Sequence, residues 1–170
     1  MIKKNEDYIG DVGDIGAGGE GIIKAEGATV FVPFCLTGEK VKFKVLKCKD
    51  NIAYGKLSEV ITPSAERSLP PCPVFGKCGG CDLQHMKYPA QLAFKRESVN
   101  ATLMKIGGIH CGVNETVPCA REYGYRNKLV LPVSIEGGVA VTGFYARHSH
   151  RIVPVNSCAI QADWADKVFS

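Results

Sequence analysis

Hydrophobic and polar residues alternate along the first third of the chain, which predicts a series of short β-strands. The alternation is clearest at Val41, Phe43 and Val45, with Lys42 and Lys44 on the opposite face. Glycines and an Asp-Asn pair separate such runs and supply turns. The predicted strands span residues 8–15, 21–24, 29–33, 41–48 and 52–61, with turns at Gly27, Gly38 and Asp50-Asn51.

Five short strands within so few residues predict a small all-β unit over residues 1–62. We expect a closed barrel of the OB type, because closure removes the exposed edges of a sheet. Residues 63–71 have the proline-rich composition of a linker. The rest of the chain, residues 72–170, then forms a second small α+β domain.

Three regular elements are predicted in this second domain. A helix over residues 89–106 begins with Pro89, carries apolar residues on one side and ends at two glycines. A hairpin follows, with strands at 125–133 and 139–145. Asp163 is the predicted cap of a further helix that begins within residues 161–170.

The bulk composition is that of an ordinary globular protein with one or two small domains, since 45% of its 170 residues are hydrophobic and 22% are charged. The polar amino terminus predicts no signal peptide, and no apolar run is long enough to cross a bilayer. We therefore expect a cytoplasmic monomer, away from membranes, whose eight cysteines stay reduced.

The net charge of +4 is unevenly distributed. Residues 1–62 contain nine lysines and nine acidic residues, whereas residues 63–170 contain twelve lysines and arginines and eight acidic residues, with every arginine of the chain among them. Arginine offers a planar fork to phosphate oxygens and can stack on bases. This distribution is compatible with a nucleic-acid partner of the second domain.

A cysteine-rich loop carries the clearest chemistry of the sequence. Cys72, Cys78 and Cys81 lie within ten residues, and two glycines separate the last two thiols. Prolines and glycines forbid a regular helix or a central strand through this loop, so side-chain packing alone cannot fix its shape. A thiolate-bound metal is the usual solution, and glycine amides can approach and hydrogen-bond its sulfur ligands.

Structural zinc sites and iron–sulfur clusters normally take four protein ligands, so a fourth residue is required. Cys158 is the candidate, because it follows a strand-like run and a turn near the end of the chain. Zinc fits less well, since structural zinc favours two close pairs of ligands. Unliganded reduced cysteines are the plainer alternative.

Basic residues gather around the predicted hairpin. Between residues 126 and 151 there are four lysines and arginines and a single acid, and two tyrosines are available for stacking. A basic sheet edge with aromatic residues is a plausible RNA contact surface. The candidate RNA-binding residues are Arg126, Lys128, Arg147, His150 and Arg151.

Several motifs carry a resemblance to a known family. They are Cys72-x5-Cys78-Gly-Gly-Cys81-x2-Gln84-His85, Tyr88-x2-Gln91-Leu92-x2-Lys95, Tyr125-Arg-Asn-Lys128, Gly143-Phe-Tyr145, and Ser149-His-Arg-Ile-Val153 followed by Cys158. With them the chain resembles the RNA uracil-C5 methyltransferases that use S-adenosylmethionine. It is most similar to the ribosomal-RNA branch, which carries an amino-terminal TRAM domain and an iron–sulfur cluster.

The resemblance implies that Cys72, Cys78, Cys81 and Cys158 hold a 4Fe–4S cluster. It also implies that the TRAM barrel and the hairpin grip RNA, with 23S rRNA as the expected substrate. In this family a separate Rossmann-like domain binds S-adenosylmethionine and supplies a cysteine nucleophile. No such domain is expected within these 170 residues, so the chain alone is expected to be inactive, with no catalytic residue of its own.

Two alternatives come from other classes of protein. A small iron–sulfur electron-transfer protein is one, although ferredoxins usually show tighter cysteine spacing. A zinc-stabilised RNA-binding module without an enzyme is the other.

Overall fold

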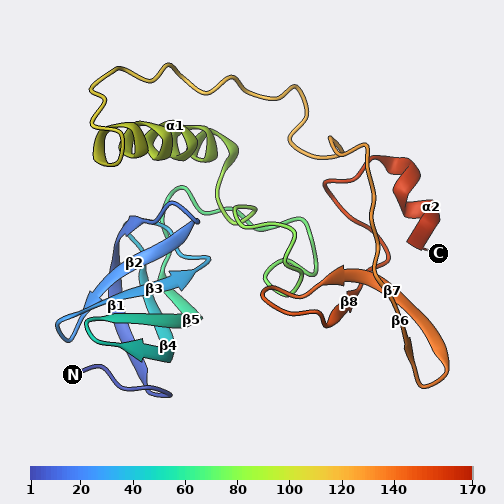
Figure 1. Cartoon of the computed structure of the whole chain (residues 1–170), viewed down its shortest axis with the longest axis horizontal. Helices are drawn as coiled ribbons and strands as arrows, with labels where there is room; N and C mark the ends of the chain where they lie inside the picture. The colour runs from blue at the N-terminus through green and yellow to red at the C-terminus, as the bar shows by residue number, and fades with distance from the viewer. Residues whose placement is uncertain (170) are drawn as a thin grey trace.

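The computed structural model describes residues 1–169, apart from the side chain of Glu136. The first third is a closed five-stranded barrel in the order β1-β2-β3-β5-β4 (Figure 1). Its strands are β1 Asp7–Ile15, β2 Glu20–Ala25, β3 Ala28–Pro33, β4 Lys40–Lys49 and β5 Ile52–Thr62. The predicted OB-type barrel is confirmed, and each predicted strand agrees with an observed one to within one residue at either end.

The barrel closes because the long strand β4 pairs antiparallel with both β1 and β5. One parallel pairing, between β3 and β5, completes the ring. The expected turns are confirmed, since Gly27, Gly38 and Asp50 all have positive φ angles. Inward-facing apolar side chains fill the interior, and those with no exposed surface include Ile23, Val30, Val41, Phe43 and Val45.

Close strand packing requires glycine at two positions of the barrel wall. A Cβ atom at Gly10 would lie 2.6 Å from the Ile23 side chain, and one at Gly21 would lie 2.6 Å from the Cβ atom of Cys35. Real Cβ atoms do not approach that closely, so any larger residue would push the wall outward.

Helix α1, Tyr88–Lys105, forms as predicted, with Pro89 in its first turn. The apolar residues on one side of this helix do not form a buried face, because no residue of the helix is buried among the described residues. Val99 is 51% exposed and Ile106 is 83% exposed. Lys95 and Arg96 interrupt the apolar stripe, so the helix lies along the surface above the barrel (Figure 1).

The second sheet contains β6 Val133–Glu136, β7 Val139–Tyr145 and β8 Ile152–Pro154, in that order. The expected strand at 125–133 is wrong, because the hairpin begins only at Val133. Pro132 has no N–H to donate to a ladder. Instead, the backbone of Arg126 forms hydrogen bonds with the backbones of Ile160 and Ala162. These bonds place the segment before the hairpin beside the segment after β8.

The chain ends in a short 3-10 turn, Asp163–Ala165, and in α2, Asp166–Phe169. The cap position belongs to Ala162 rather than to Asp163, and it makes no side-chain capping bond. Ser170, the last residue of the predicted helix, lies outside the described residues. None of the helices in the described part of the chain has the length and hydrophobicity to span a lipid bilayer.

A buried carboxylate fixes the segment that leaves the barrel. Glu39 has no exposed surface, and its oxygens accept hydrogen bonds from the backbone N–H groups of Leu36 and Ser64. Arg67 adds two more, from Nε at 2.5 Å and from Nη2 at 2.7 Å. Burial raises the pKa of Glu39, but the bonds from Arg67, Leu36 and Ser64 outweigh it and hold the pKa below its usual value.

The ring of Phe34 joins the barrel to the cysteine loop. Its φ angle is +66°, a conformation that bulky residues adopt only when their surroundings enforce it. The ring centroid lies 5.0 Å from that of Phe75 and 6.0 Å from that of His85, and the guanidinium of Arg147 lies 5.5 Å above it. Aromatic and cation–π contacts therefore hold both later segments against one barrel residue.

His85 lies at the centre of this junction, with 1% of its surface exposed. Neither ring nitrogen of His85 forms a hydrogen bond within residues 1–169. The Cys35 backbone lies near enough to raise the pKa of the imidazole, but by less than burial and Arg67 lower it. Burial and then the charge of Arg67 lower the pKa of His85 to about 4. The imidazole is therefore neutral in the folded protein at pH 7.

The Arg67→Met variant tests the ion pair. It leaves the buried Glu39 carboxylate with its backbone donors only, and we expect the free energy of unfolding to fall by about 3–5 kcal/mol. Chemical denaturation measures this loss. Arg96→Met is the control, because Arg96 pairs with Glu97 at the surface, and its loss should stay below about 1 kcal/mol. Equal losses in the two variants would contradict the assigned importance of Glu39.

A pH dependence tests the buried imidazole. The unfolded chain binds a proton at His85 near pH 6.5 and the folded chain near pH 4, so acid favours unfolding between these values. We expect stability to fall by about 2 kcal/mol from this group between pH 7 and pH 5. The His85→Phe variant should lose that part of the slope. Parallel pH profiles for the two proteins, measured by denaturant unfolding, would refute this role.

Candidate functional site

Four cysteines border one cavity between the cysteine loop and the end of the second sheet. Cys72, Cys78 and Cys81 come from the loop, and Cys158 comes from the segment after β8. All four are partly buried. The described residues include every cysteine of the chain, and none of the eight forms a disulfide bond. The tertiary structure thus places Cys158 beside the three loop cysteines despite their distance in sequence.

Backbone hydrogen bonds give the loop its shape. The N–H of Phe75 donates to the Cys72 carbonyl and the N–H of Cys78 donates to the Val74 carbonyl, around a Gly76 with φ of +79°. The N–H of Gly80 donates to Cys78 Sγ at 3.4 Å. The expected approach of a glycine amide to a sulfur atom is therefore confirmed.

The loop is tied to the second sheet at Gly79. Its N–H donates to the Tyr145 carbonyl at 2.9 Å, and a Cβ atom there would lie 3.1 Å from the Arg147 Cα atom. Glycine permits this close approach of two backbones. The loop thiols are consequently held against the end of β7.

Burial dominates the electrostatics of the thiols. It raises the pKa of Cys78 and Cys81, and the other cysteines at the cavity raise it further. The Gly80 N–H and the positive charge of Arg126 act in the opposite direction on Cys78, and a hydrogen bond from Gln84 does so on Cys81. Neighbouring thiols resist losing their protons together, because the resulting thiolates repel one another. A bound metal cation neutralises the thiolates and so favours their deprotonation.

The arrangement does not form a coordination sphere for a single ion. Among the described residues, no group of three or more His, Cys, Asp or Glu side chains could hold a metal ion. The donor set itself, four free thiols on one cavity, is of the kind that iron–sulfur clusters take.

Two buried amides flank the same cavity. Gln84 is 8% exposed and Gln161 is 5% exposed, and the Oε1 atom of each lacks a hydrogen-bond partner within the described part of the chain. Sequence reasoning assigned them no role. The place of Gln84 within the cysteine motif, three residues after Cys81, was the available signal in the sequence. No sequence signal marked Gln161, because only the pairing of its segment with Arg126 brings it to this cavity.

The predicted RNA-binding residues lie in different environments. Lys128, His150 and Arg151 are exposed, and the ring of His150 meets that of Tyr145 edge-on at 5.4 Å. Arg126 is exposed and borders the cysteine cavity. The Arg147 guanidinium forms an ion pair with Asp82 and lies over Phe34, so it is already engaged within the fold.

The barrel contributes a second basic surface. Lys44, Lys47 and Lys49 are exposed along β4. On the outer wall, the rings of Phe31 and Tyr54 stack with centroids 5.8 Å apart, and Tyr54 pairs in register with Lys47. Exposed aromatic rings beside lysines are features of single-stranded nucleic-acid binding.

The chain is similar to several bacterial proteins over nearly its whole length. It is 46% identical over 98% of its residues to an uncharacterized RNA methyltransferase of Clostridium tetani, and 44% identical over 98% to one of Clostridium acetobutylicum. No protein-family model matches it.

One solved structure is similar to this chain in sequence and fold. It is the Pyrococcus abyssi tRNA (uracil-54, C5)-methyltransferase in complex with S-adenosyl-L-homocysteine, with a TM-score of 0.67 and 26% identity over 94% of this chain. The chain is homologous to part of an RNA methyltransferase. It spans about 36% of the Clostridium tetani relative and 34% of the Pyrococcus abyssi protein. The predicted resemblance to RNA methyltransferases is confirmed.

Proposed function

We propose that this chain is the RNA-binding and iron–sulfur-bearing part of an S-adenosylmethionine-dependent RNA uracil-C5 methyltransferase. The observation that carries this proposal is the 46% identity to an RNA methyltransferase over 98% of the chain. The Pyrococcus abyssi structure supports uracil C5 as the target atom and S-adenosylmethionine as the methyl donor. The reducing cytoplasm is the compartment that suits free thiols and an RNA substrate.

We assign the methyl-transfer chemistry to the part of the relatives that this chain does not span. Methylation at C5 of an electron-poor pyrimidine requires a nucleophile that adds to the ring and a base that removes the C5 proton. The target base must also leave its stack to reach such groups. The role of this chain is to bind the RNA so that the target base can be presented.

For the cofactor, we propose that Cys72, Cys78, Cys81 and Cys158 hold a 4Fe–4S cluster. Support comes from their position around one cavity and from the glycine amide that already bonds one sulfur. A cluster binds each thiolate through a different iron atom, so its ligands need not approach one another as closely as around one zinc ion. When bound, the cluster would link the cysteine loop covalently to the segment after β8.

For the RNA surface, we propose that Lys128, His150 and Arg151 contact phosphates directly, with Arg126 beside the cysteine cavity as a fourth contact. Their exposure supports this assignment. Arg147 supports the surface indirectly, because its ion pair with Asp82 joins the β7–β8 connection to the cysteine loop. The exposed lysines of β4 and the stacked rings of Phe31 and Tyr54 form a further basic surface on the barrel that could contact the same RNA.

Ribosomal RNA is the proposed substrate, and tRNA is the second candidate. The named activity of the Pyrococcus abyssi protein favours tRNA, whereas the motif resemblance favours 23S rRNA. Binding competition between a tRNA and a 23S rRNA fragment distinguishes the two.

Anaerobic reconstitution with iron and sulfide tests the cluster. We expect about four iron and four sulfide ions per chain, with the broad visible absorbance of a cluster, and loss of both on Cys72→Ser, Cys78→Ser, Cys81→Ser or Cys158→Ser. Cys111→Ser is the matched control, because this exposed thiol lies outside the cavity.

Two outcomes would overturn the cluster assignment. Full iron content in the Cys158→Ser variant would remove Cys158 from the ligand set. One tightly bound zinc per chain, with no sulfide, would replace the cluster by a zinc site. Fast reversible reduction of a bound cluster by a partner protein would leave the cluster assignment standing, but it would favour electron transfer over RNA binding as the function.

RNA affinity as a function of salt tests the surface. We expect Lys128→Ala and Arg151→Ala each to weaken binding and to reduce the slope of log K against log salt by about 0.7–0.9, because each change removes one phosphate contact. The control is Lys3→Ala, since the amino terminus lies at the far end of the barrel from the second sheet (Figure 1). Unchanged slopes in both variants would refute the assigned contacts.

A further inference from the structure

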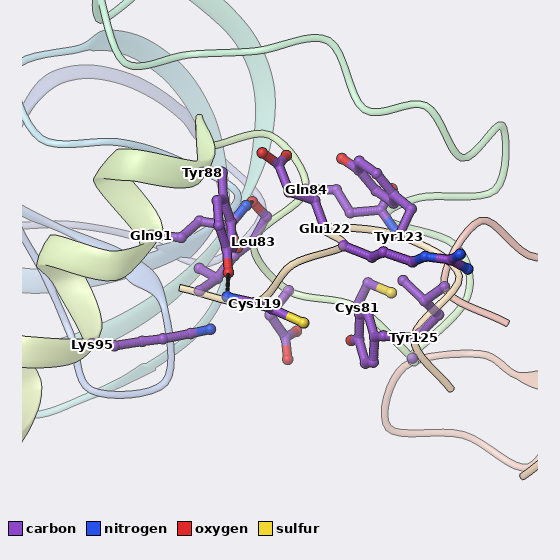
Figure 2. A pocket seen from close by; sticks show the side chains of 14 residues that line it. Cys81, Leu83, Gln84, Tyr88, Gln91, Lys95, Cys119, Glu122, Tyr123 and Tyr125 are labelled. Atoms are coloured by element: carbon purple, nitrogen blue, oxygen red, sulfur yellow. Dashed lines mark hydrogen bonds between the residues drawn. The ribbon is translucent and has the colours of Figure 1, made fainter. Parts of the chain in front are cut away.

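A second cavity shares Cys81 with the cysteine cavity and has a volume of about 430 Å³. Its wall comes from the cysteine loop, the first turns of α1 and the segment 119–125 (Figure 2). This volume lies within the range of small-molecule pockets. The proposed functions of the thiols and of the basic surface make no use of it.

The cavity has an aromatic wall. Tyr88, Tyr123 and Tyr125 line it, and Tyr123 and Tyr125 keep 38% and 54% of their surface exposed. Tyr88 is held in place, because its Oη accepts a hydrogen bond of 2.7 Å from the Cys119 N–H. That bond also anchors the segment 119–125 to the helix. Exposed rings around a cavity provide faces on which a flat ligand can stack.

One buried acceptor lacks a partner at this wall. Gln84 is 8% exposed, lines the cavity, and its Oε1 has no hydrogen-bond partner among residues 1–169. Gln91, in contrast, is already satisfied, since its amide donates to the Leu83 and Met86 carbonyls. The Gln84 oxygen has almost no accessible surface of its own, so a ligand N–H donor would reach it, and recover the cost of the missing hydrogen bond, once the Gln84 amide rotates toward the cavity.

The charged groups of the wall suit a ligand that carries a phosphate. Lys95 reaches toward the cavity from α1, opposite Cys81, Tyr123 and Tyr125 (Figure 2), and Arg121 also lines it. Of the two acids, Asp82 is paired with Arg147, which leaves Glu122 exposed. Two cations against one uncommitted carboxylate favour an anion at the mouth.

We propose that this cavity binds one unstacked base of the RNA, with its phosphate near Lys95 and Arg121. The base stacks on Tyr123 or Tyr125, and rotation of the Gln84 amide lets its Oε1 accept a hydrogen bond from an N–H of the base edge. An apolar ligand would leave that oxygen unpaired, and a simple anion would not use the rings. The inference rests on the proposed RNA-binding function, and it adds a base-binding pocket beside the proposed cluster.

An abasic scan tests the pocket in the reconstituted full chain. A single-stranded RNA is bound first intact and then with each nucleotide in turn made abasic. We expect one position at which loss of the base weakens binding at least fivefold. In the Tyr123→Ala/Tyr125→Ala variant this effect should disappear, while the salt slope stays unchanged, because the tyrosines carry no charge. The Tyr123→Phe/Tyr125→Phe variant keeps both rings and should retain the effect.

The contrary outcomes are separable. RNA binding that tolerates every abasic position overturns the pocket and leaves the proposed function standing. An absence of RNA binding by the wild-type chain overturns the proposed function and the pocket together. Uridine and adenosine monophosphates form the last arm: binding of these as tight as that of the RNA, and lost in the alanine variant, would assign the cavity to free nucleotides and refute an RNA base.

Discussion

The buried carboxylate of Glu39 is the constraint on which the arrangement of the two halves depends. A carboxylate without exposed surface is costly unless it is fully hydrogen-bonded, and Glu39 obtains its donors from Leu36, Ser64 and Arg67. Two of these three residues lie in the segment that leaves the barrel. The barrel therefore determines where that segment begins. The Arg67–Met86 and Ser68–His85 backbone pairings then hold the end of the cysteine loop against this segment.

Phe34 and Arg147 extend this constraint to the second sheet. Arg147 stacks over Phe34 and pairs with Asp82, so one side chain contacts the barrel and the cysteine loop at once. The Gly79–Tyr145 backbone bond adds a second connection. A loop that has few apolar side chains of its own is thus held from two sides. This explains how thiols far apart in sequence reach one cavity before any metal contributes.

The proposed cluster and the proposed base pocket share Cys81 and Gln84 as parts of their walls. A cluster that fixes Cys81 would also fix one wall of the neighbouring pocket. Under these two proposals, the cluster would have a structural role in RNA binding. Rigid walls reduce the entropy lost when a base is bound, which is the general benefit of a preorganised site.

The sequence by itself determined the barrel and the cysteine motif. Alternation on β4 and glycines at turns specify local backbone geometry, which requires no information about distant residues. The cysteine spacing is likewise a local property. Only the tertiary structure decided that Arg126 pairs with the segment of Gln161 instead of forming a strand, that Arg147 is committed to Asp82, and that α1 leaves Val99 exposed. These outcomes depend on which distant groups compete for the same hydrogen bonds and charges, and that competition is settled only when the whole chain has folded.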